Sequence, residues 1–245
     1  EYNARALTLI ADDKNAVQGV VVRIDGEERN VRTRKGVILC AGGFAMNQEM
    51  LKRYVPKLSV GNVPVGNPGD TGAGILMGQG VGGALIHMNE AFITLPFYPP
   101  GSLTFGIFVN AQAQRFINED IYHARMAHHI LNQVGNGIFL IVNHDDYEHP
   151  PFLNANVAGT GESIEELAEE IGLDADMLRH TVEFYNKNAA QLKDPAFHKH
   201  EAWLKPIEPP YAALNCTPGS GALYPYFTLG GLDTLATGEV LTMER

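Results

Sequence analysis

The sequence GVILCAGGF, residues 36–44, decides the fold that we expect, because an apolar segment runs directly into two adjacent glycines. Glycine has no side chain, so such a turn lets the backbone approach a ligand closely. A second bare turn, TLGGL at residues 228–232, lies near the other end of the chain. Two glycine turns separated by most of the sequence are therefore predicted to frame one binding site.

The residues around the first turn predict an α/β arrangement in which a ribbon, a strand, a glycine turn and a helix follow one another. Asp25-Gly26 is a hairpin turn between β-branched segments, and Asn47 is a helix cap. The expected strands are residues 6–10, 17–24, 28–33 and 37–41, and the expected helices are residues 48–54 and 73–80.

The second half of the chain predicts further helices and strands beyond a proline-rich connector at residues 92–101. Ser163 with Glu166 forms a capping box, Gly172 ends that helix, and Asp174 caps the next. The expected strands are residues 106–110 and 137–143, and a helix is expected at residues 120–133.

Composition excludes several classes of partner. The 245 residues are 45% hydrophobic, and a net charge of −10 with 18 scattered basic residues argues against nucleic acid or an anionic membrane surface. No apolar run approaches the ~20 residues of a membrane span, and no signal peptide is recognisable. We therefore expect a cytoplasmic protein with a small-molecule ligand. Cys40 and Cys216 form no CxxC pair and are expected to be reduced.

Two patterns that could indicate binding sites, a glycine motif and two groups of histidines, are better explained by structural roles. Gly78, Gly80 and Gly83 match the GxGxxG spacing, but a loop and a helix precede them instead of a strand, so tight helix packing is favoured. The histidines of residues 123–129 and 144–149 lack HExxH spacing and a cysteine partner, so solvated polar residues are favoured over a metal site.

The segment RFINEDIYHAR, residues 115–125, concentrates charged and polar side chains just after the expected domain boundary. Composition alone favours an ordinary charged helix start, with the acids placed to suit the helix dipole. A functional cluster is the open alternative.

Six segments in order carry a family resemblance: VRTRKGVILCAGGF, NPGDTGAGILMGQGVGGAL, FVNAQAQRFINED, LRHTVEFYNKNA, PPYAALNC and FTLGGLDTLATGEVL. Over nearly the whole chain they resemble the flavoproteins of the fumarate reductase and 3-ketosteroid dehydrogenase superfamily. The resemblance implies a partial, Rossmann-like α/β FAD-binding domain with an antiparallel ribbon, and an inserted α+β cap domain. Residues 1–98 and 207–245 would form the flavin domain, and residues 99–206 the cap. It also implies a fragment, because the family's first GxGxxG strand, which cradles the FAD pyrophosphate, and its closing segment fall outside this sequence.

For the cofactor, the resemblance implies FAD held largely by backbone groups. The implied contacts are Ala41, Gly42, Gly43, Gly230 and Gly231, the last two under the flavin ring. Many relatives carry an aspartate in a TGDG turn where this chain has TGAG at residues 71–74. Asp70 is then the candidate for that contact.

The resemblance also separates two branches of the family. Enoate reductases hold a dicarboxylate with the histidine of an HTxGG turn and use an arginine after RFxNE as proton donor, whereas Phe227 and His123 stand at these positions here. A buried carboxylate without charged partners is costly, so we expect a small apolar ketone such as a 3-ketosteroid. Tyr122 is the first candidate for the acid that hydrogen-bonds the substrate carbonyl. Tyr211 is the second, and a plain packing role explains it equally well.

The predicted function is that of an FAD-dependent dehydrogenase of the ketosteroid type. A substrate proton leaves to a base and a hydride passes to flavin N5, which forms a carbon-carbon double bond conjugated to a ketone. The electron acceptor is unidentified. An enoate reductase running in the opposite direction is the alternative within the family, and a fragment that folds without flavin or activity is the alternative of another class.

Overall fold

The computed structural model describes residues 1–61, 63–95, 101–149 and 155–243. It divides into two compact units, each with its own helices and strands, so the chain has mixed helix and sheet content. Unit 1 comprises Glu1–Ser59, Pro64–Phe92 and Phe227–Arg245, and unit 2 comprises Val60–Val63 and Ile93–Tyr226.

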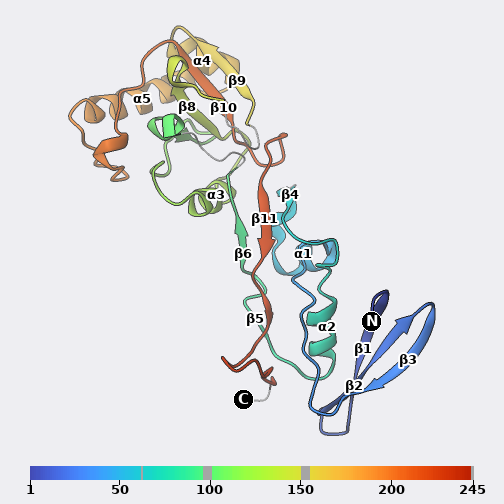
Figure 1. Cartoon of the computed structure of the whole chain (residues 1–245). Coiled ribbons are helices and arrows are strands. Elements are labelled where there is room, and N and C mark those ends of the chain that lie inside the picture. Colours follow the sequence, from blue (N-terminus) through green and yellow to red (C-terminus); the bar gives the residue numbers. More distant parts are fainter. Residues whose placement is uncertain (62, 96–100, 150–154, 244–245) are drawn as a thin grey trace. The chain divides into compact units, whose positions relative to one another are not determined.

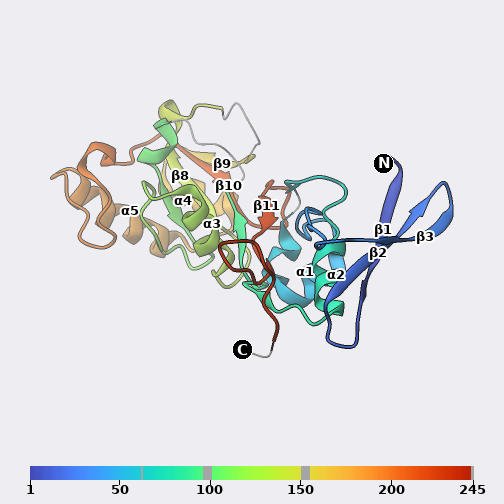
Figure 2. The same cartoon turned by 60° about the horizontal axis from the view of Figure 1, so that its bottom comes forward.

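Unit 1 contains the predicted antiparallel ribbon and two helices (Figures 1 and 2). The ribbon pairs its strands in the order β1-β2-β3, and the short strands β5 and β12 pair with each other. The elements are β1 (Ala4–Ala11), β2 (Val17–Ile24), β3 (Glu27–Arg32), α1 (Gln48–Tyr54), α2 (Ala73–Gly80), β5 (Leu85–Ile86) and β12 (Gly231–Leu232).

Three more strands form a sheet with the order β4-β11-β6. They are β4 (Val63–Pro64), β6 (Ala91–Ile93) and β11 (Pro225–Thr228). The chain passes from unit 1 to unit 2 within β6 and returns within β11. The expected connector at residues 92–101 therefore begins inside a strand, and its residues 96–100 lie outside the described part of the chain.

Local signals place the helices of unit 1 as predicted. The Asn47 side chain accepts hydrogen bonds from the amides of Glu49 and Met50, both at 3.1 Å, and so starts α1. Inside α2, a side chain at Gly78 would collide with the Leu232 methyl groups. Tight packing thus explains this glycine, as the sequence indicated.

The strand predicted at residues 37–41 does not form. These residues are irregular, and Ile38 is 89% exposed. A strand requires a neighbour for its amides and carbonyls. No strand of the described chain pairs with this segment, so the apolar pattern alone does not produce one.

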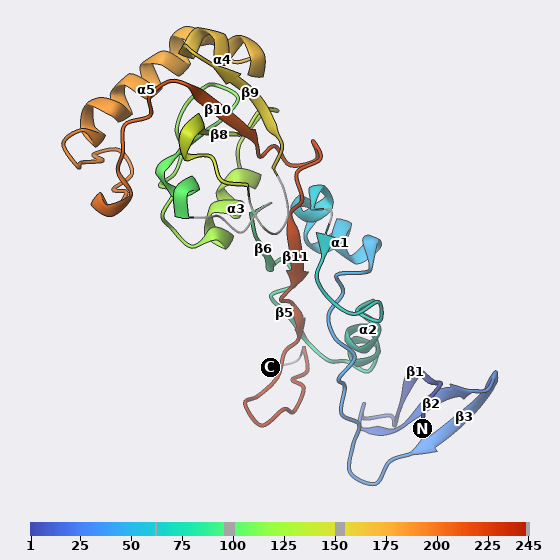
Figure 3. The ribbon, with the colours of Figure 1, turned by 45° about the horizontal axis from the view of Figure 1, so that its top comes forward.

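Unit 2 is built on a four-stranded antiparallel sheet with the order β7-β8-β10-β9. Helices α4 and α5 lie over one face of this sheet, as Figure 3 shows. The elements are β7 (Ile107–Val109), α3 (His123–Leu131), β8 (Phe139–Asn143), β9 (Val157–Gly161), α4 (Ile164–Ile171), α5 (Ala175–Ala189) and β10 (Tyr211–Asn215). Short 3-10 turns occupy Gly101–Phe105, His144–Asp146 and Glu201–Trp203 in this unit, and another at Pro56–Val60 lies mostly in unit 1.

The core of unit 2 follows the two-residue period of its strands. Ile107, Val109 and Ile141 face α4 and α5, where they pack with Leu167 and Leu178. The alternate strand residues are buried as well, which makes the sheet apolar on both faces.

The helix ends of unit 2 confirm the predicted caps. Ser163 Oγ accepts from the Glu166 amide at 3.2 Å, and Asp174 Oδ1 accepts from the Met177 amide at 2.9 Å. Gly172 ends α4 with φ 68°. In contrast, the helix predicted from residue 120 begins only at His123, so residues 115–121 are not a helix start. The reason lies in the burial of Arg115 and Glu119, described below.

The limits of the two units differ from the predicted domain limits of 98/99 and 206/207. Residues 207–226 lie in unit 2, because β10 is hydrogen-bonded between β8 and β9 in its sheet. The predicted limit at residue 98 falls outside the described residues.

Asn186 on α5 gives a test of how the helix holds the chain that enters β10. Its side chain accepts from the Ile207 amide and donates to the Ile207 carbonyl, both at 2.7 Å. We expect Asn186→Ala to lower the free energy of unfolding by about 1–3 kcal/mol, because both backbone groups lose their partner. Urea unfolding followed by the fluorescence of Trp203, the only tryptophan, measures it.

Asn188→Ala is the matched control, because among the described residues the Asn188 side chain bonds within its own helix, to the Phe184 carbonyl. We expect it to change stability by less than about 1 kcal/mol. Equal effects of the two substitutions would contradict the proposed anchoring.

Candidate functional site

Three turns far apart in the sequence meet within unit 1. The Gly43 carbonyl accepts from the Gly72 amide at 2.9 Å, and the Phe44 amide donates to Thr228 Oγ1 at 3.1 Å. The first glycine turn, at residues 41–44, is thus bonded to Gly72 at the start of α2 and to Thr228, the first residue of the second glycine turn. The structure therefore brings together the two bare turns that the sequence singled out.

Gly42 and Asp70 lie against each other in this meeting point. Gly42 has φ 70°, a conformation that favours glycine, and any side chain there would collide with Asp70 Oδ1. Asp70 Oδ2 accepts from the Asn67 amide at 3.0 Å. The carboxylate is therefore fixed beside the Gly42 backbone, as expected if Asp70 takes part in the same site.

The backbone of this turn can accept a ligand rich in hydrogen-bond acceptors. In the part of the chain that the structure describes, the amides of Ala41, Gly42 and Gly43 donate to no protein group, and Ala41 and Gly42 are exposed. Phosphate, ribityl and ring oxygens are acceptors that such amides bind. The residues present therefore fit the phosphate- and sugar-bearing cofactor that the sequence predicts.

The two glycines of the second turn differ in what surrounds them. A side chain at Gly230 would collide with the Met88 backbone and lie 2.6 Å from the His87 carbonyl oxygen, whereas Gly231 faces open space. Gly230 therefore serves the packing of the chain. Gly231 leaves room for a ligand.

An aromatic pair lies beside these turns. Phe92 on β6 and Phe227 on β11 stack with ring centroids 4.8 Å apart and an interplanar angle of 14°. Phe227 immediately precedes Thr228, which holds the first glycine turn. The pair thus presents an apolar surface next to the candidate cofactor contacts.

The two tyrosine candidates both lie in unit 2 but in different surroundings. Tyr122 is 59% exposed and directly precedes α3, with its ring centroid 4.5 Å from that of His123. Tyr211 is 8% exposed and belongs to the core that packs against α4 and α5. Burial raises the pKa of the Tyr211 phenol, and Glu208 and Glu165 raise it further. These surroundings favour the packing role for Tyr211 and leave Tyr122 as the accessible candidate.

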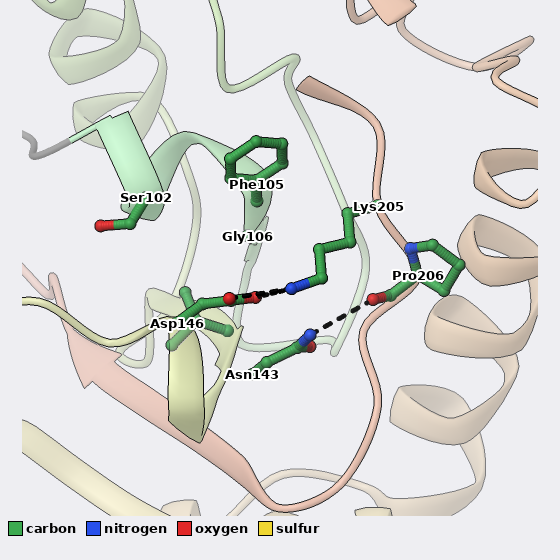
Figure 4. Close-up of a pocket in the computed structure, with 8 residues that line it drawn as sticks. Ser102, Phe105, Gly106, Asn143, Asp146, Lys205 and Pro206 are labelled. Atoms are coloured by element: carbon green, nitrogen blue, oxygen red, sulfur yellow. Dashed lines mark hydrogen bonds and ion pairs between the residues drawn. The ribbon is translucent and has the colours of Figure 1, made fainter. Parts of the chain in front are cut away.

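Two hollows of unit 2 do not involve these tyrosines. In the first, Lys205 reaches across to Asp146 with Nζ–O distances of 2.8 and 2.6 Å, and Asn143 donates to the Pro206 carbonyl (Figure 4). This hollow is closed by its own side chains. The second, of about 380 Å³, lies beside α5 and is lined partly by Phe184. Neither hollow is lined by Tyr122 or Tyr211.

Other kinds of site find no support in the described residues. Within them, no three His, Cys, Asp or Glu side chains gather as a metal site would require. Across the same part of the chain, no helix has both the length and the apolar character needed to cross a bilayer. Cys40 is exposed and Cys216 is buried, and both are free thiols.

Sequence reasoning missed two contributors to this site. Thr228 holds the first glycine turn through its hydroxyl, and its place two residues before Gly230 is the signal that could have identified it. Phe92 gave no such signal, because its stacking on Phe227 joins residues 135 positions apart.

Comparison with known proteins shows the family of the chain. The model of the FAD binding domain family matches residues 2–245, so the chain belongs to this family. It is 29% identical to a fumarate reductase (cytochrome) of Shewanella frigidimarina, over 99% of this chain and 44% of that protein. It is 30% identical to a 3-oxosteroid 1-dehydrogenase of Mycolicibacterium smegmatis, over 80% of this chain and 41% of that protein.

Among solved structures, the chain is similar to a 3-ketosteroid-Δ4-(5α)-dehydrogenase of Rhodococcus jostii in complex with 4-androstene-3,17-dione. The TM-score is 0.88 and the identity 37%, over 99% of this chain and 50% of that one. A flavocytochrome c3 fumarate reductase matches with a TM-score of 0.59 and 26% identity, over 98% of this chain and 44% of that one. The chain thus spans about half the length of the relatives it matches, and both branches are present among them.

The contrast between the adjacent glycines gives a test of the second turn. We expect Gly230→Ala to lower the free energy of unfolding by about 1–3 kcal/mol, because its methyl group must displace the backbone at Met88. Gly231→Ala is expected to leave stability within about 1 kcal/mol but to weaken FAD retention, because its methyl group enters the open side.

Urea unfolding followed by circular dichroism and the flavin absorbance retained after desalting measure the two effects. If Gly231→Ala retains FAD as the unchanged protein does, Gly231 is not a ring contact.

Proposed function

We propose that this chain forms part of an FAD-dependent dehydrogenase of the ketosteroid type, which introduces a carbon-carbon double bond next to the ketone of a small apolar substrate. The relatives that support this proposal include a ketosteroid dehydrogenase structure at 37% identity. The electron acceptor is left open.

Unit 1 is proposed to hold the cofactor. The amides of Ala41, Gly42 and Gly43 would donate to its oxygens, and the Asp70 carboxylate would accept from a sugar hydroxyl. Gly230 and Gly231 would lie below the ring. When bound, FAD supplies the acceptor for a hydride. The Rossmann-like description of unit 1 stays a prediction, because residues 37–41 pair with no strand in the described chain. Unit 2, with its separate sheet and core, is proposed as the cap.

The aromatic pair is the observation that carries the choice of substrate. Where the enoate reductase pattern has the histidine of HTxGG, this chain has Phe227, and its ring is stacked on Phe92. A phenyl ring offers dispersion contacts but no charge and no hydrogen-bond donor. A dicarboxylate would leave a charge poorly compensated at such a surface. A neutral, apolar ketone suits it.

Tyr122 is proposed as the group that donates a hydrogen bond to the substrate ketone. Its exposure lets the phenol reach a ligand, and a phenol is a donor that stays neutral at physiological pH. Such a bond stabilises the negative charge that develops on the oxygen as the neighbouring carbon loses a proton.

Flavin binding and bleaching test the proposal. The purified protein is mixed with FAD, desalted, and titrated anaerobically with a saturated 3-ketosteroid while the visible flavin band is recorded. We expect the flavin to be retained and the steroid to bleach it. If the steroid does not bleach the flavin but fumarate reoxidises chemically reduced flavin, the result would instead support the enoate reductase. A colourless protein would support a fragment that binds no flavin.

The role of Tyr122 has its own test. We expect Tyr122→Phe to slow steroid bleaching by about 10²- to 10⁴-fold, because the hydrogen bond to the ketone is lost, while FAD retention is unchanged. Stopped-flow absorbance measures the rate. Tyr2→Phe is the control, because Tyr2 is 96% exposed and lies in unit 1. Bleaching of Tyr122→Phe at the unchanged rate would rule out this residue.

A further inference from the structure

Unit 2 contains a closed cluster of buried charges, formed by Arg115, Glu119, Asp194 and Lys199 and called here the charge cluster. Arg115 donates to both oxygens of Glu119, at 3.0 and 2.7 Å, and its third nitrogen lies 2.9 Å from Asp194. Lys199 Nζ lies 3.2 Å from Glu119. All four side chains are at most 6% exposed, so two cations and two anions neutralise one another largely shielded from water.

The charge cluster joins two segments that are far apart in the sequence. One is residues 115–120, and the other is residues 194–200, which follow α5. A further bond joins them directly, since the His200 amide donates to Asp120 Oδ2 at 2.7 Å. Both segments are also tied to the β7 region, because Glu119 accepts from the Phe108 amide at 3.0 Å and Lys199 donates to the Gly106 carbonyl at 2.8 Å.

Each buried charge would raise the free energy of the folded chain if it had no partner, so the four charges stabilise this arrangement together. Burial lowers the pKa of Lys199, and Glu119 offsets this effect only in part. Burial alone would raise the pKa of Asp194, but the Lys199 amide and the Arg115 guanidinium outweigh it and lower that pKa. The anion and the cations therefore depend on their mutual contacts for their charged forms.

The bond between the His200 amide and Asp120 lies two residues before Tyr122. The Tyr122 ring is 59% exposed, so core packing does not fix it. Its backbone continues the segment that leads from Arg115 to the start of α3, so a shift of that segment moves Tyr122 with it. Residues 115–121 belong to no helix, and Glu119 and Asp120 form a turn.

We propose that residues 194–200 clamp residues 115–121, and that Lys199 is thereby a positioning residue for Tyr122. This inference rests on the proposed function for the role of Tyr122. An acid displaced by about 1 Å from its substrate can lose about 10²-fold in rate. Lys199 sits at the centre of the clamp, where it bridges Glu119 of one segment and the β7 region.

The test compares Lys199→Met with Lys205→Met. Lys205 pairs with Asp146 in the same unit and is 47% exposed (Figure 4). Hydrogen exchange measured by mass spectrometry is expected to accelerate at least about tenfold in Lys199→Met for peptides within residues 116–123, with no change in β8. Lys205→Met is expected to leave residues 116–123 unchanged.

A kinetic readout accompanies the exchange. In Lys199→Met we expect steroid bleaching of the flavin to slow by about 10- to 100-fold with FAD retention unchanged, because Tyr122 is displaced. Lys199→Arg keeps the cation and is expected to restore most of the rate. If Lys199→Met does not fold, Asp120→Ala replaces it, since this change removes the direct bond to His200 together with the local bond from the Asn118 side chain.

The exchange results decide whether the proposed clamp exists. Exchange that is unchanged at residues 116–123, or accelerated equally in β8, overturns it, because the effect is then absent or general. If the unchanged protein is not bleached by the steroid, the proposed function fails, and the exchange comparison alone supports or overturns the clamp.

Discussion

The mutual neutralisation of four buried charges is the constraint on which much of unit 2 depends. An isolated buried ion costs several kcal/mol, so none of the four can be placed without the others. Arg115 also lies 5.0 Å from the ring centroids of both Tyr185 and Phe197, so the chain after α5 must return to cover it. Burial of Arg115 therefore fixes residues 194–200, which belong to no α-helix or strand.

The structure of unit 1 depends on a different constraint, namely that the backbones of its three turns lie very close together. At Gly74 a side chain would lie 3.0 Å from the Ala41 methyl group, and at Gly43 it would lie 2.7 Å from Thr228 Oγ1. The three turns can meet only because these positions carry no side chain. The same absence leaves the amides at Ala41 and Gly42 exposed, so the packing of the turns and their capacity to bind a ligand have one cause.

The sequence predicted those features that depend on neighbours in the chain. The caps at Asn47, Ser163 and Asp174 act on amides two or three residues away, and all three formed. The strand at residues 37–41 did not form, because a strand depends on a partner that local pattern does not specify. The charged start predicted for the segment after Arg115 was wrong for a similar reason. Its acid at Glu119 binds Arg115 four residues before it, but both are buried together with Lys199 and Asp194, which lie about 80 residues further along the chain.

The candidate site shows the same division. The glycine turns were recognisable because a missing side chain is visible in the sequence itself, whereas the apolar wall is not, since Phe92 and Phe227 meet only through the pairing of distant strands. A phenyl ring that is already stacked excludes water from one face and offers no charge to the other. The proposed site would then disfavour carboxylate substrates without a negatively charged residue to repel them. Loss of the imidazole and gain of the stacking partner together would direct the proposed site toward neutral substrates.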